Sequence, residues 1–233
     1  MEKNELQNLI NQEEITCSNE QVDLLFAFMD KTLEANEKFN LTAIKDRDQF
    51  IEKMLFDSAL VLKDVDLDNK SIIDVGTGAG FPGVVVKILN SKADVTLLDS
   101  TNKKINHLNQ VSKELNIDIH TICERVEAFA LANREKYDFA TARAVASLSI
   151  LLELIMPIIK VGGYFLAMKG ADYADEVNSA KQAFKKLNCS IQSIYECELP
   201  VSKEKRAIIR IRKDGPTNKK YPREYKEIKR LPL

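Results

Sequence analysis

Residue types that bind metals or form disulfides are scarce in this sequence. Its 233 residues include two histidines and four cysteines, and no two cysteines have the Cys-x-x-Cys spacing. The six residues are His107, His120, Cys17, Cys123, Cys189 and Cys197. Metal sites need ligands at tighter, regular spacing. We therefore expect no metal, take these side chains as structural or incidental, and expect a reducing, cytoplasmic environment.

Long apolar runs are missing as well. The strongest candidate, residues 148–159, is too short to cross a bilayer and is broken by Glu153 and Pro157. Residues 1–5 have neither the charge pattern nor the apolar block of a secretory signal. We expect no membrane partner. A content of 45% hydrophobic and 30% charged residues is that of an ordinary globular protein with one substantial core.

The formal net charge of −1 predicts no nucleic-acid partner by itself, but the charges are segregated. Residues 201–233 contain twelve Lys/Arg and four Asp/Glu, whereas residues 1–200 contain 22 and 31. A basic segment of this kind is a candidate contact surface for a polyanion. A solvated, partly disordered tail explains the composition equally well.

Residues 71–83 organise the rest of the chain. A short apolar run containing Asp74 leads into three closely spaced glycines, Gly76, Gly78 and Gly80, before a helical pattern begins. Glycine can adopt positive φ in a tight turn, and it lacks the Cβ that would hold a ligand away from the backbone. This pattern is typical of the strand–turn–helix junction that opens nucleotide-binding α/β domains. An ordinary Gly-rich turn is the alternative.

Strands and helices alternate after this turn. We expect strands at residues 93–99, 117–122, 137–142 and 164–168, helices at 84–89, 103–115, 148–156 and 174–187, and two final strands at 190–197 and 206–212. The alternation predicts a mostly parallel sheet with helices on both faces. The last two strands have no helix between them and predict an antiparallel hairpin. The predicted fold class is α/β, with a seven-stranded sheet in residues 67–213.

Residues 1–66 are predicted to form an N-terminal helical cap. Residues 18–21 form a capping box, with Ser18 as N-cap and Gln21 three residues later, and apolar residues follow at helical spacing as far as Leu33. A second helix is expected over residues 46–62. Both helices have the apolar stripe of packing elements and would cover one end of the sheet. Residues 214–233 form a third segment, a basic C-terminal tail.

Ligands of such sheets bind beyond the carboxyl ends of the strands, where the strand order reverses. Besides the glycine turn, three segments would converge there: Asp99 after the second strand, residues 125–129 after the third, and residues 141–144 after the fourth. Asp99 follows Asp74 by 25 residues and is placed to accept both hydroxyls of a ribose. The backbone N–H of Val126 and an acceptor on Glu127 would read an adenine edge.

Arg143 stands in a run of small and apolar residues. A buried arginine needs an anionic or carbonyl partner. Two roles are therefore open for Arg143, because structural ion pairs and ligand-binding groups both occur in such surroundings.

Seven motifs carry a resemblance to a known family: residues 39–42 (FNLT), 56–58 (FDS), 74–83 (DVGTGAGFPG), 97–100 (LLDS), 125–127 (RVE), 142–144 (ARA) and 168–170 (MKG). Together, and over essentially the whole chain, they resemble the bacterial small-subunit ribosomal RNA guanine-N7 methyltransferases, also called glucose-inhibited division protein B. The resemblance implies a Rossmann-like, class I S-adenosylmethionine-dependent methyltransferase acting on one guanine of 16S ribosomal RNA. The family's binding positions fall on Gly76, Phe81, Val126, Glu127 and Arg143.

The chain departs from the family's pattern at three places. Members commonly have histidine at the position of Met54, and many have it directly after the arginine that matches Arg206, where this chain has Ala207. The roles of those histidines therefore do not carry over. The end of the chain resembles the basic tails of some members only as far as Arg223, since Glu224 and the following tyrosine do not fit.

The implied reaction needs no general base, because guanine N7 has a free lone pair and no proton. Catalysis would consist of alignment, with the reactive methyl supplied by S-adenosylmethionine. Arg143 is the candidate catalytic residue. We expect it to bind the methionine carboxylate of the cofactor, or guanine O6 alone, because chelating O6 and N7 together would occupy the attacking lone pair.

Four basic residues are candidates for phosphate contacts with 16S ribosomal RNA or the small ribosomal subunit: Lys169, Arg206, Arg210 and Arg212. We expect their contribution to weaken steeply with salt, and we expect the protein to be a monomer.

Three other functions remain open from the sequence. A methyltransferase of small molecules would use the same cofactor, but the basic end of the chain favours RNA. A nicotinamide-dependent oxidoreductase would have the Gly-x-Gly-x-x-Gly spacing, which differs from that of Gly76, Gly78 and Gly80. A non-enzymatic ribosome-assembly factor would keep the fold without binding the cofactor.

Overall fold

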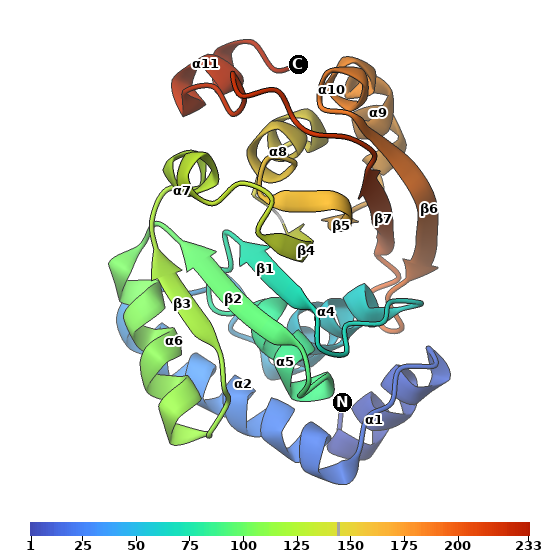
Figure 1. Ribbon diagram of the computed structural model, residues 1–233. Helices are drawn as coiled ribbons and strands as arrows, with labels where there is room; N and C mark the ends of the chain where they lie inside the picture. The colour runs from blue at the N-terminus through green and yellow to red at the C-terminus, as the bar shows by residue number, and fades with distance from the viewer. Residues whose placement is uncertain (144) are drawn as a thin grey trace.

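The computed structural model describes residues 1–143 and 145–233, so that Ala144, the last residue of the expected fourth site segment, lies outside the described residues. Seven strands form one sheet in the order β3-β2-β1-β4-β5-β7-β6 (Figure 1). Their bounds are β1 Ser71–Val75, β2 Asp94–Asp99, β3 His120–Cys123, β4 Tyr137–Arg143, β5 Ile159–Lys169, β6 Cys189–Glu198 and β7 Lys205–Lys213. The first five strands pair in parallel, and β7 is antiparallel to both of its neighbours. The predicted mostly parallel sheet with a terminal hairpin is confirmed.

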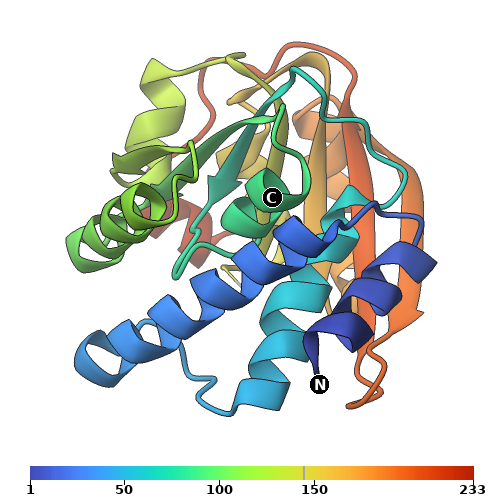
Figure 2. The same cartoon turned by 90° about the horizontal axis from the view of Figure 1, so that it is seen from below.

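Helices cover both faces of the sheet. One face carries α1 Lys3–Gln12, α2 Asn19–Phe39, α3 Arg47–Phe50, η1 Ile51–Phe56, α4 Asp57–Ala59, η2 Leu60–Leu62, α5 Gly83–Leu89 and α6 Asn102–Glu114. The other face carries α7 Val126–Ala132, α8 Leu148–Ile155, α9 Tyr173–Ser179, α10 Lys181–Lys186 and α11 Tyr225–Arg230. Figure 2 shows the N-terminal helices lying across the same face as α5 and α6. The cap therefore covers a face of the sheet, and not one end of it.

Alternation along the strands divides the core into two. Ile72 and Leu97 face the core under the N-terminal helices, whereas their chain neighbours Ile73 and Leu98 face the core under α8. Successive side chains of a strand point to opposite faces, and a parallel sheet covered on both sides therefore has apolar residues at consecutive positions. The strands are fixed in register by these two cores, and this register fixes which residues reach the carboxyl edge.

The predicted capping box begins α2. The Ser18 hydroxyl accepts the Gln21 N–H at 3.2 Å, and the Gln21 side chain accepts the Ser18 N–H at 2.9 Å. The helix ends where Asn40 adopts left-handed φ of 50°. It runs six residues beyond Leu33, since Thr32 and Asn36 are buried and continue its inner face.

Several predicted elements have different bounds. The helix expected over 46–62 consists of α3, the π-helical turn η1, α4 and η2, and the helix expected over 174–187 is divided at Ala180. β5 begins at Ile159 and not at Tyr164, because Gly162, with φ of 87°, and Gly163 carry the strand through a register irregularity next to β4. A Cβ on Gly163 would lie 2.5 Å from the Asp138 carbonyl oxygen, so only glycine fits there.

Three helices were not predicted: α1, α7 and α11. The last of them lies in the basic tail, where Tyr221 and Ile228 are buried against the core under α8. Residues 214–233 are thus packed onto the domain, which the composition alone did not reveal.

None of the helices in the described ranges is long and apolar enough to span a membrane. Within residues 1–143 and 145–233, no group of three His, Cys, Asp or Glu side chains is arranged to hold a metal ion.

Candidate functional site

The glycine turn lies at the carboxyl edge of the sheet, between β1 and α5. Gly76, Gly78 and Gly80 have φ of 72°, 61° and 100°, which L-residues with a Cβ rarely adopt. The Gly76 N–H donates to the Leu98 carbonyl at 2.8 Å, which ties the turn to β2. A Cβ on Gly78 would meet nothing closer than 3.9 Å, so the space above this residue is open to a ligand.

Asp74 lies beneath this turn, with 1% of its surface exposed. One carboxylate oxygen accepts the Thr77 hydroxyl at 2.7 Å and the Gly83 N–H at 2.8 Å, which closes the turn from below. Burial raises the pKa of Asp74 to about 6, against the hydrogen bonds from Thr77 and Gly83, which lower it. Asp74 shapes the turn, and a direct contact with a cofactor stays a prediction.

Asp99 stands at the end of β2 and lines a cleft of about 310 Å³ together with Gly76, Val126 and Glu127. Its oxygens accept the Gly78 N–H at 3.0 Å and the Thr101 N–H at 2.9 Å, and Lys104 Nζ lies 3.5 Å away. A carboxylate can accept more hydrogen bonds than these. The structure therefore brings four sequence-predicted residues together around a group that is able to accept the hydroxyls of a ribose.

Val126 and Glu127 begin α7, which follows β3 directly. The first N–H groups of a helix have no partner within the helix, and the N-cap residue Arg125 makes no side-chain cap bond. The Val126 N–H is thus available at the cleft, as the predicted contact with an adenine edge requires. That contact stays a prediction.

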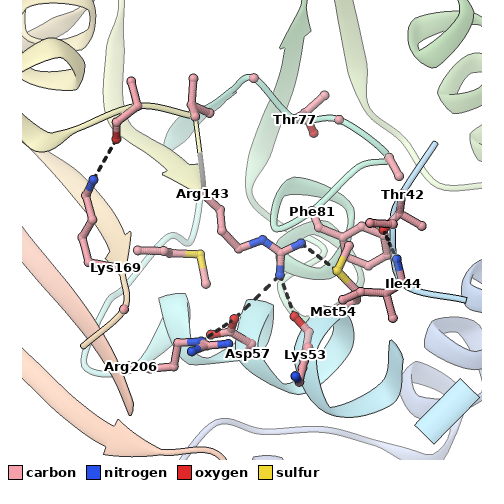
Figure 3. Close-up of a pocket in the computed structure, with 18 of the residues that line it drawn as sticks. Thr42, Ile44, Lys53, Met54, Asp57, Thr77, Phe81, Arg143, Lys169 and Arg206 are labelled. Atoms are coloured by element: carbon pink, nitrogen blue, oxygen red, sulfur yellow. Dashed lines mark hydrogen bonds and ion pairs between the residues drawn. The ribbon is translucent and has the colours of Figure 1, made fainter. Parts of the chain in front are cut away.

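A larger cavity of about 900 Å³ adjoins this cleft (Figure 3). It is lined from the glycine turn, the π-helical turn η1, the ends of β4 and β5, and β7, with the residues Leu41, Thr42, Ala43, Ile44, Lys53, Met54, Asp57, Gly76, Thr77, Gly78, Ala79, Phe81, Arg143, Val145, Ala146, Ser147, Met168, Lys169, Gly170, Glu176, Glu204 and Arg206. Gly76, Arg143 and Val145 line both spaces. A Cβ on Gly76 would lie 2.7 Å from Val145 Cγ2, so Val145 packs on the turn between the cleft and the cavity.

Arg143 projects from the end of β4 into this cavity (Figure 3). It donates from Nη1 to the Lys53 carbonyl at 2.8 Å and from Nη2 to Met54 Sδ at 3.1 Å, and it lies 3.8 Å from Asp57. Burial lowers the pKa of Arg143, while Asp57 and Asp74 oppose this shift. Arg143 therefore has carbonyl and anionic partners within the protein, and it still has more N–H donors than these contacts use.

Phe81 is the residue that the family resemblance added to the site. Its ring is 3% exposed and packs against Phe28 and Phe50, with centroid distances of 5.2 and 5.4 Å. The Arg143 guanidinium lies 5.7 Å from its centroid on the cavity side. Phe81 thus supports Arg143 at the cavity wall, which fits either role that the sequence left open.

Two of the four proposed RNA contacts line the cavity. Lys169 donates to Glu176 at 2.7 Å and to the Ala146 carbonyl at 2.9 Å, and its side chain is 7% exposed. Arg206 donates to Asp57 at 3.0 Å and to Glu204 at 2.8 Å. Both cations already have anionic partners, so a phosphate would have to replace a carboxylate.

Arg210 and Arg212 lie elsewhere. They stand opposite Leu166 and Tyr164 in the sheet, which places Arg212 about 20 Å along β7 from Arg206. Arg210 donates to the Asp64 carbonyl at 3.0 Å and covers the Tyr164 ring at 4.5 Å. These two arginines do not converge with the other site residues, and RNA contacts by them stay predictions for a different surface.

The sequence did not single out the acidic residues of the cavity. Asp57 appeared only within the FDS motif, and Glu176 and Glu204 were not noticed, although all three line the cavity. Asp57 and its partner Arg206 are 149 residues apart, and no local signal marks such a pair. Glu176 and Glu204 also have nearer partners, Lys169 and Arg206, at seven and two residues along the chain.

A family model described as "rRNA small subunit methyltransferase G" matches residues 21–208 of the chain. Ribosomal RNA small subunit methyltransferase G of Acetivibrio thermocellus is 44% identical over 222 residues, covering 94% of this chain and 91% of the relative. The protein of the same name from Clostridium botulinum is 38% identical over 234 residues, covering 99% and 98%.

Solved structures share the fold at low sequence identity. A SAM-dependent methyltransferase from Aquifex aeolicus has a TM-score of 0.55 and 18% identity, covering 74% of this chain and 96% of that one. M. jannaschii TYW2, solved in complex with AdoMet, has a TM-score of 0.57 and 11% identity, covering 73% and 79%. The expected methyltransferase-type fold is confirmed.

Proposed function

The chain belongs to the rRNA small subunit methyltransferase G family, and we propose that it transfers a methyl group from S-adenosylmethionine to N7 of one guanine in 16S ribosomal RNA. The single observation that carries this proposal is the pair of adjoining spaces at the carboxyl edge, joined at Gly76 and Arg143. One has the groups that bind a nucleoside, and the other has the size of a base-binding cavity.

The residues of the cleft fit the cofactor. Asp99 would accept the ribose hydroxyls, the Val126 N–H and Glu127 would bind the adenine, and the open space over Gly78 would admit the chain between ribose and amino acid. Arg143 would meet the methionine carboxylate. When bound, S-adenosylmethionine supplies an electrophilic methyl group on a sulfonium.

The cavity residues would hold the guanine. Its N7 lone pair attacks without losing a proton, so the chain needs to orient the base and exclude water, and needs no base catalyst. Arg143, Phe81 and Met54 form the wall nearest the glycine turn. Lys169 and Arg206 also line the cavity, and a phosphate of the flanking RNA would take over contacts that Glu176 and Glu204 now make with them.

This function also gives the coarse setting. A substrate in the small ribosomal subunit places the reaction in the bacterial cytoplasm, and we propose that the protein acts as a monomer. The protein surface around the cavity, where RNA would bind, would determine which nucleotide is modified.

The test is methylation of small ribosomal subunits and of naked 16S ribosomal RNA with labelled S-adenosylmethionine, followed by mapping of the modified base. We expect label on N7 of one guanine. Label on a small molecule only, or no uptake of S-adenosylmethionine in calorimetry, would reject the proposal.

Arg143→Ala is the matching variant. Cofactor affinity and turnover should both fall, while Asp57 keeps Arg206 as a partner and the fold is retained. The melting temperature is the control for folding. If the variant is folded and both values are unchanged, Arg143 is a structural residue only.

A further inference from the structure

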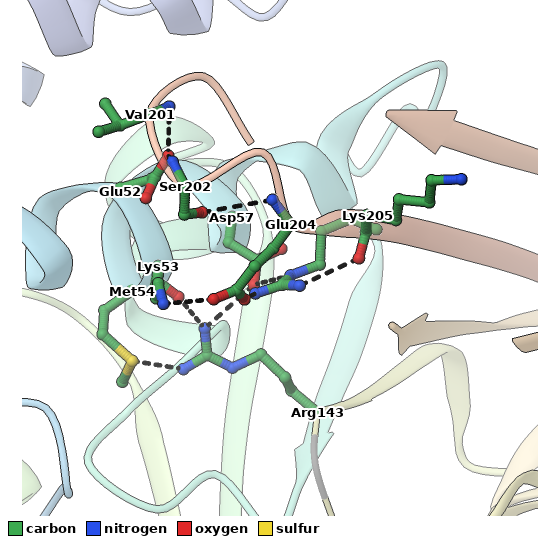
Figure 4. A network of polar contacts seen from close by, with 10 residues as sticks. Glu52, Lys53, Met54, Asp57, Arg143, Val201, Ser202, Glu204 and Lys205 are labelled. Carbon is green, nitrogen blue, oxygen red and sulfur yellow. Dashed lines mark hydrogen bonds and ion pairs between the residues drawn. The ribbon is translucent and has the colours of Figure 1, made fainter. Parts of the chain in front are cut away.

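A buried carboxylate outside the cavity contacts the turn between β6 and β7, which leads into two wall residues of the cavity. Glu52 lies in η1 and is 2% exposed. One of its oxygens accepts the backbone N–H groups of Val201 and Ser202, at 2.6 and 2.8 Å, in the turn between β6 and β7 (Figure 4). A buried charge is costly unless it is hydrogen-bonded, so these two bonds fix the turn against η1.

Ion pairs connect this turn to the cavity (Figure 4). Glu204, at its end, pairs with Lys53 and with Arg206, and Arg206 in turn donates to Asp57 at 3.0 Å. Asp57 lies 3.8 Å from Arg143. Lys53, Glu204 and Arg206 line the cavity, whereas Glu52 does not.

In the π-helical turn η1, the residue that holds the β6–β7 turn and the residue that pairs with Glu204 are consecutive. The turn η1 has the wider hydrogen bonding of a π-helix, seen where the Asp57 N–H donates to the Glu52 carbonyl, and its successive side chains point in different directions. Glu52 points to the turn between β6 and β7, and Lys53 points to the cavity and pairs with Glu204. The same short segment therefore binds the turn twice.

We propose that Glu52 is a positioning residue for the RNA-facing wall of the cavity: by holding the N–H groups of Val201 and Ser202, it sets Glu204, and through it Arg206, where Arg206 meets the phosphate that flanks the guanine. This inference rests on the proposed function. Asp99, Val126 and Glu127 of the cleft lie on other elements, and Arg143, which lines both spaces, is held directly by the Lys53 carbonyl and Met54. We therefore expect the effect of Glu52 on RNA to exceed its effect on the cofactor.

The test compares three variants in methylation of unmodified small subunits. Glu52→Gln keeps an oxygen able to accept both N–H groups and should retain the wild-type KM for subunits. Glu52→Asp withdraws the carboxylate by one methylene, so that it no longer reaches both N–H groups, and should raise that KM about tenfold, the effect of losing about one hydrogen bond. Asp48→Asn is the matched control, since Asp48 is on the preceding turn and pairs with the amino terminus of Met1.

Three measurements decide the outcome: the KM for subunits, the Kd for S-adenosylmethionine and the rate of amide exchange. The Kd for S-adenosylmethionine should stay within about twofold of wild type in every variant, and amide exchange at Val201 and Ser202 should speed up only in Glu52→Asp. An equal rise in cofactor Kd, or a loss in Glu52→Gln as large as in Glu52→Asp, would overturn the positioning role. Unchanged amide exchange in Glu52→Asp would overturn it whatever the methylation result, whereas absence of methylation by the wild type rejects the proposed function.

Discussion

The contact between Arg223 and Glu153 gives the sharpest prediction about stability. Glu153 lies in α8 and is 0% exposed. Arg223, in the basic C-terminal segment, donates to it from the backbone N–H at 3.0 Å, from Nε at 2.8 Å and from Nη2 at 2.7 Å. Hydrogen bonding to Glu153 raises the pKa of Arg223 further above its ordinary range.

Arg223→Ala leaves Glu153 buried with only the backbone N–H as a partner. Removing one member of a buried pair costs about 3–5 kcal/mol, because the remaining charge keeps its desolvation penalty. For a domain of this size, that loss corresponds to a fall in melting temperature on the order of 10 °C. Urea unfolding with linear extrapolation measures the same loss as a lower midpoint at an unchanged m-value.

The double variant separates charge from packing. Replacing Glu153 by Met in the Arg223→Ala background removes the unpaired carboxylate, and most of the lost stability should return. Arg230→Ala is the control, since Arg230 is exposed in the same segment and its loss should change stability by less than about 0.5 kcal/mol. A cost for Arg223→Ala below about 1 kcal/mol, at an unchanged m-value, would refute this reasoning.

Three further predictions concern the glycine turn and the cleft. The pKa of Asp74 is about 6 in the folded state and 3.8 as its ordinary value, so the free energy of unfolding falls as the pH rises from about 4 to about 7. Asp74→Asn should remove this pH dependence, which amounts to about 2–3 kcal/mol. Urea unfolding at pH 4 and at pH 7 measures the difference. In Gly83→Ala the new Cβ would lie 2.2 Å from Leu97 Cδ2, and we expect the free energy of unfolding, measured in urea, to fall by about 1–3 kcal/mol. Gly170→Ala is the control and should change it very little, because the Cβ there meets nothing within 4 Å. Asp99→Ala should raise the Kd for S-adenosylmethionine about tenfold or more in calorimetry, and an unchanged Kd would exclude the ribose contact.

The sequence predicted the parts of the fold that depend on local pattern. The glycine turn requires residues that accept positive φ, and the strands have apolar residues at consecutive positions, so both are visible in any short window. Asp99 was identified because its role depends on its place at the end of a strand. The sheet edge and the cleft follow from these two features.

The parts that were missed depend on contacts between distant segments. Glu153 looked like a break in an apolar run, and its partner lies 70 residues later. Glu52 was not singled out, and its partners are 149 and 150 residues away. The π-helical turn has no sequence signal of its own, since it depends on how its side chains pack and pair. Short helices such as α7 fall below the length at which periodicity is decisive.

The excess of basic residues in 201–233 indicated a polyanion partner, but some of these residues already form ion pairs within the fold. Four of the basic residues in 201–233 have acidic partners: Arg206 with Asp57 and Glu204, Arg212 with Asp214, Lys213 with Glu135, and Arg223 with Glu153. A phosphate that takes a cation from a carboxylate exchanges one anion for another and releases few counterions. The salt dependence of RNA binding should therefore be shallower than twelve unpaired basic residues would give. RNA specificity then depends on how the cavity's ion pairs rearrange, which gives the position of Arg206, and of Glu52 behind it, more weight than the overall charge.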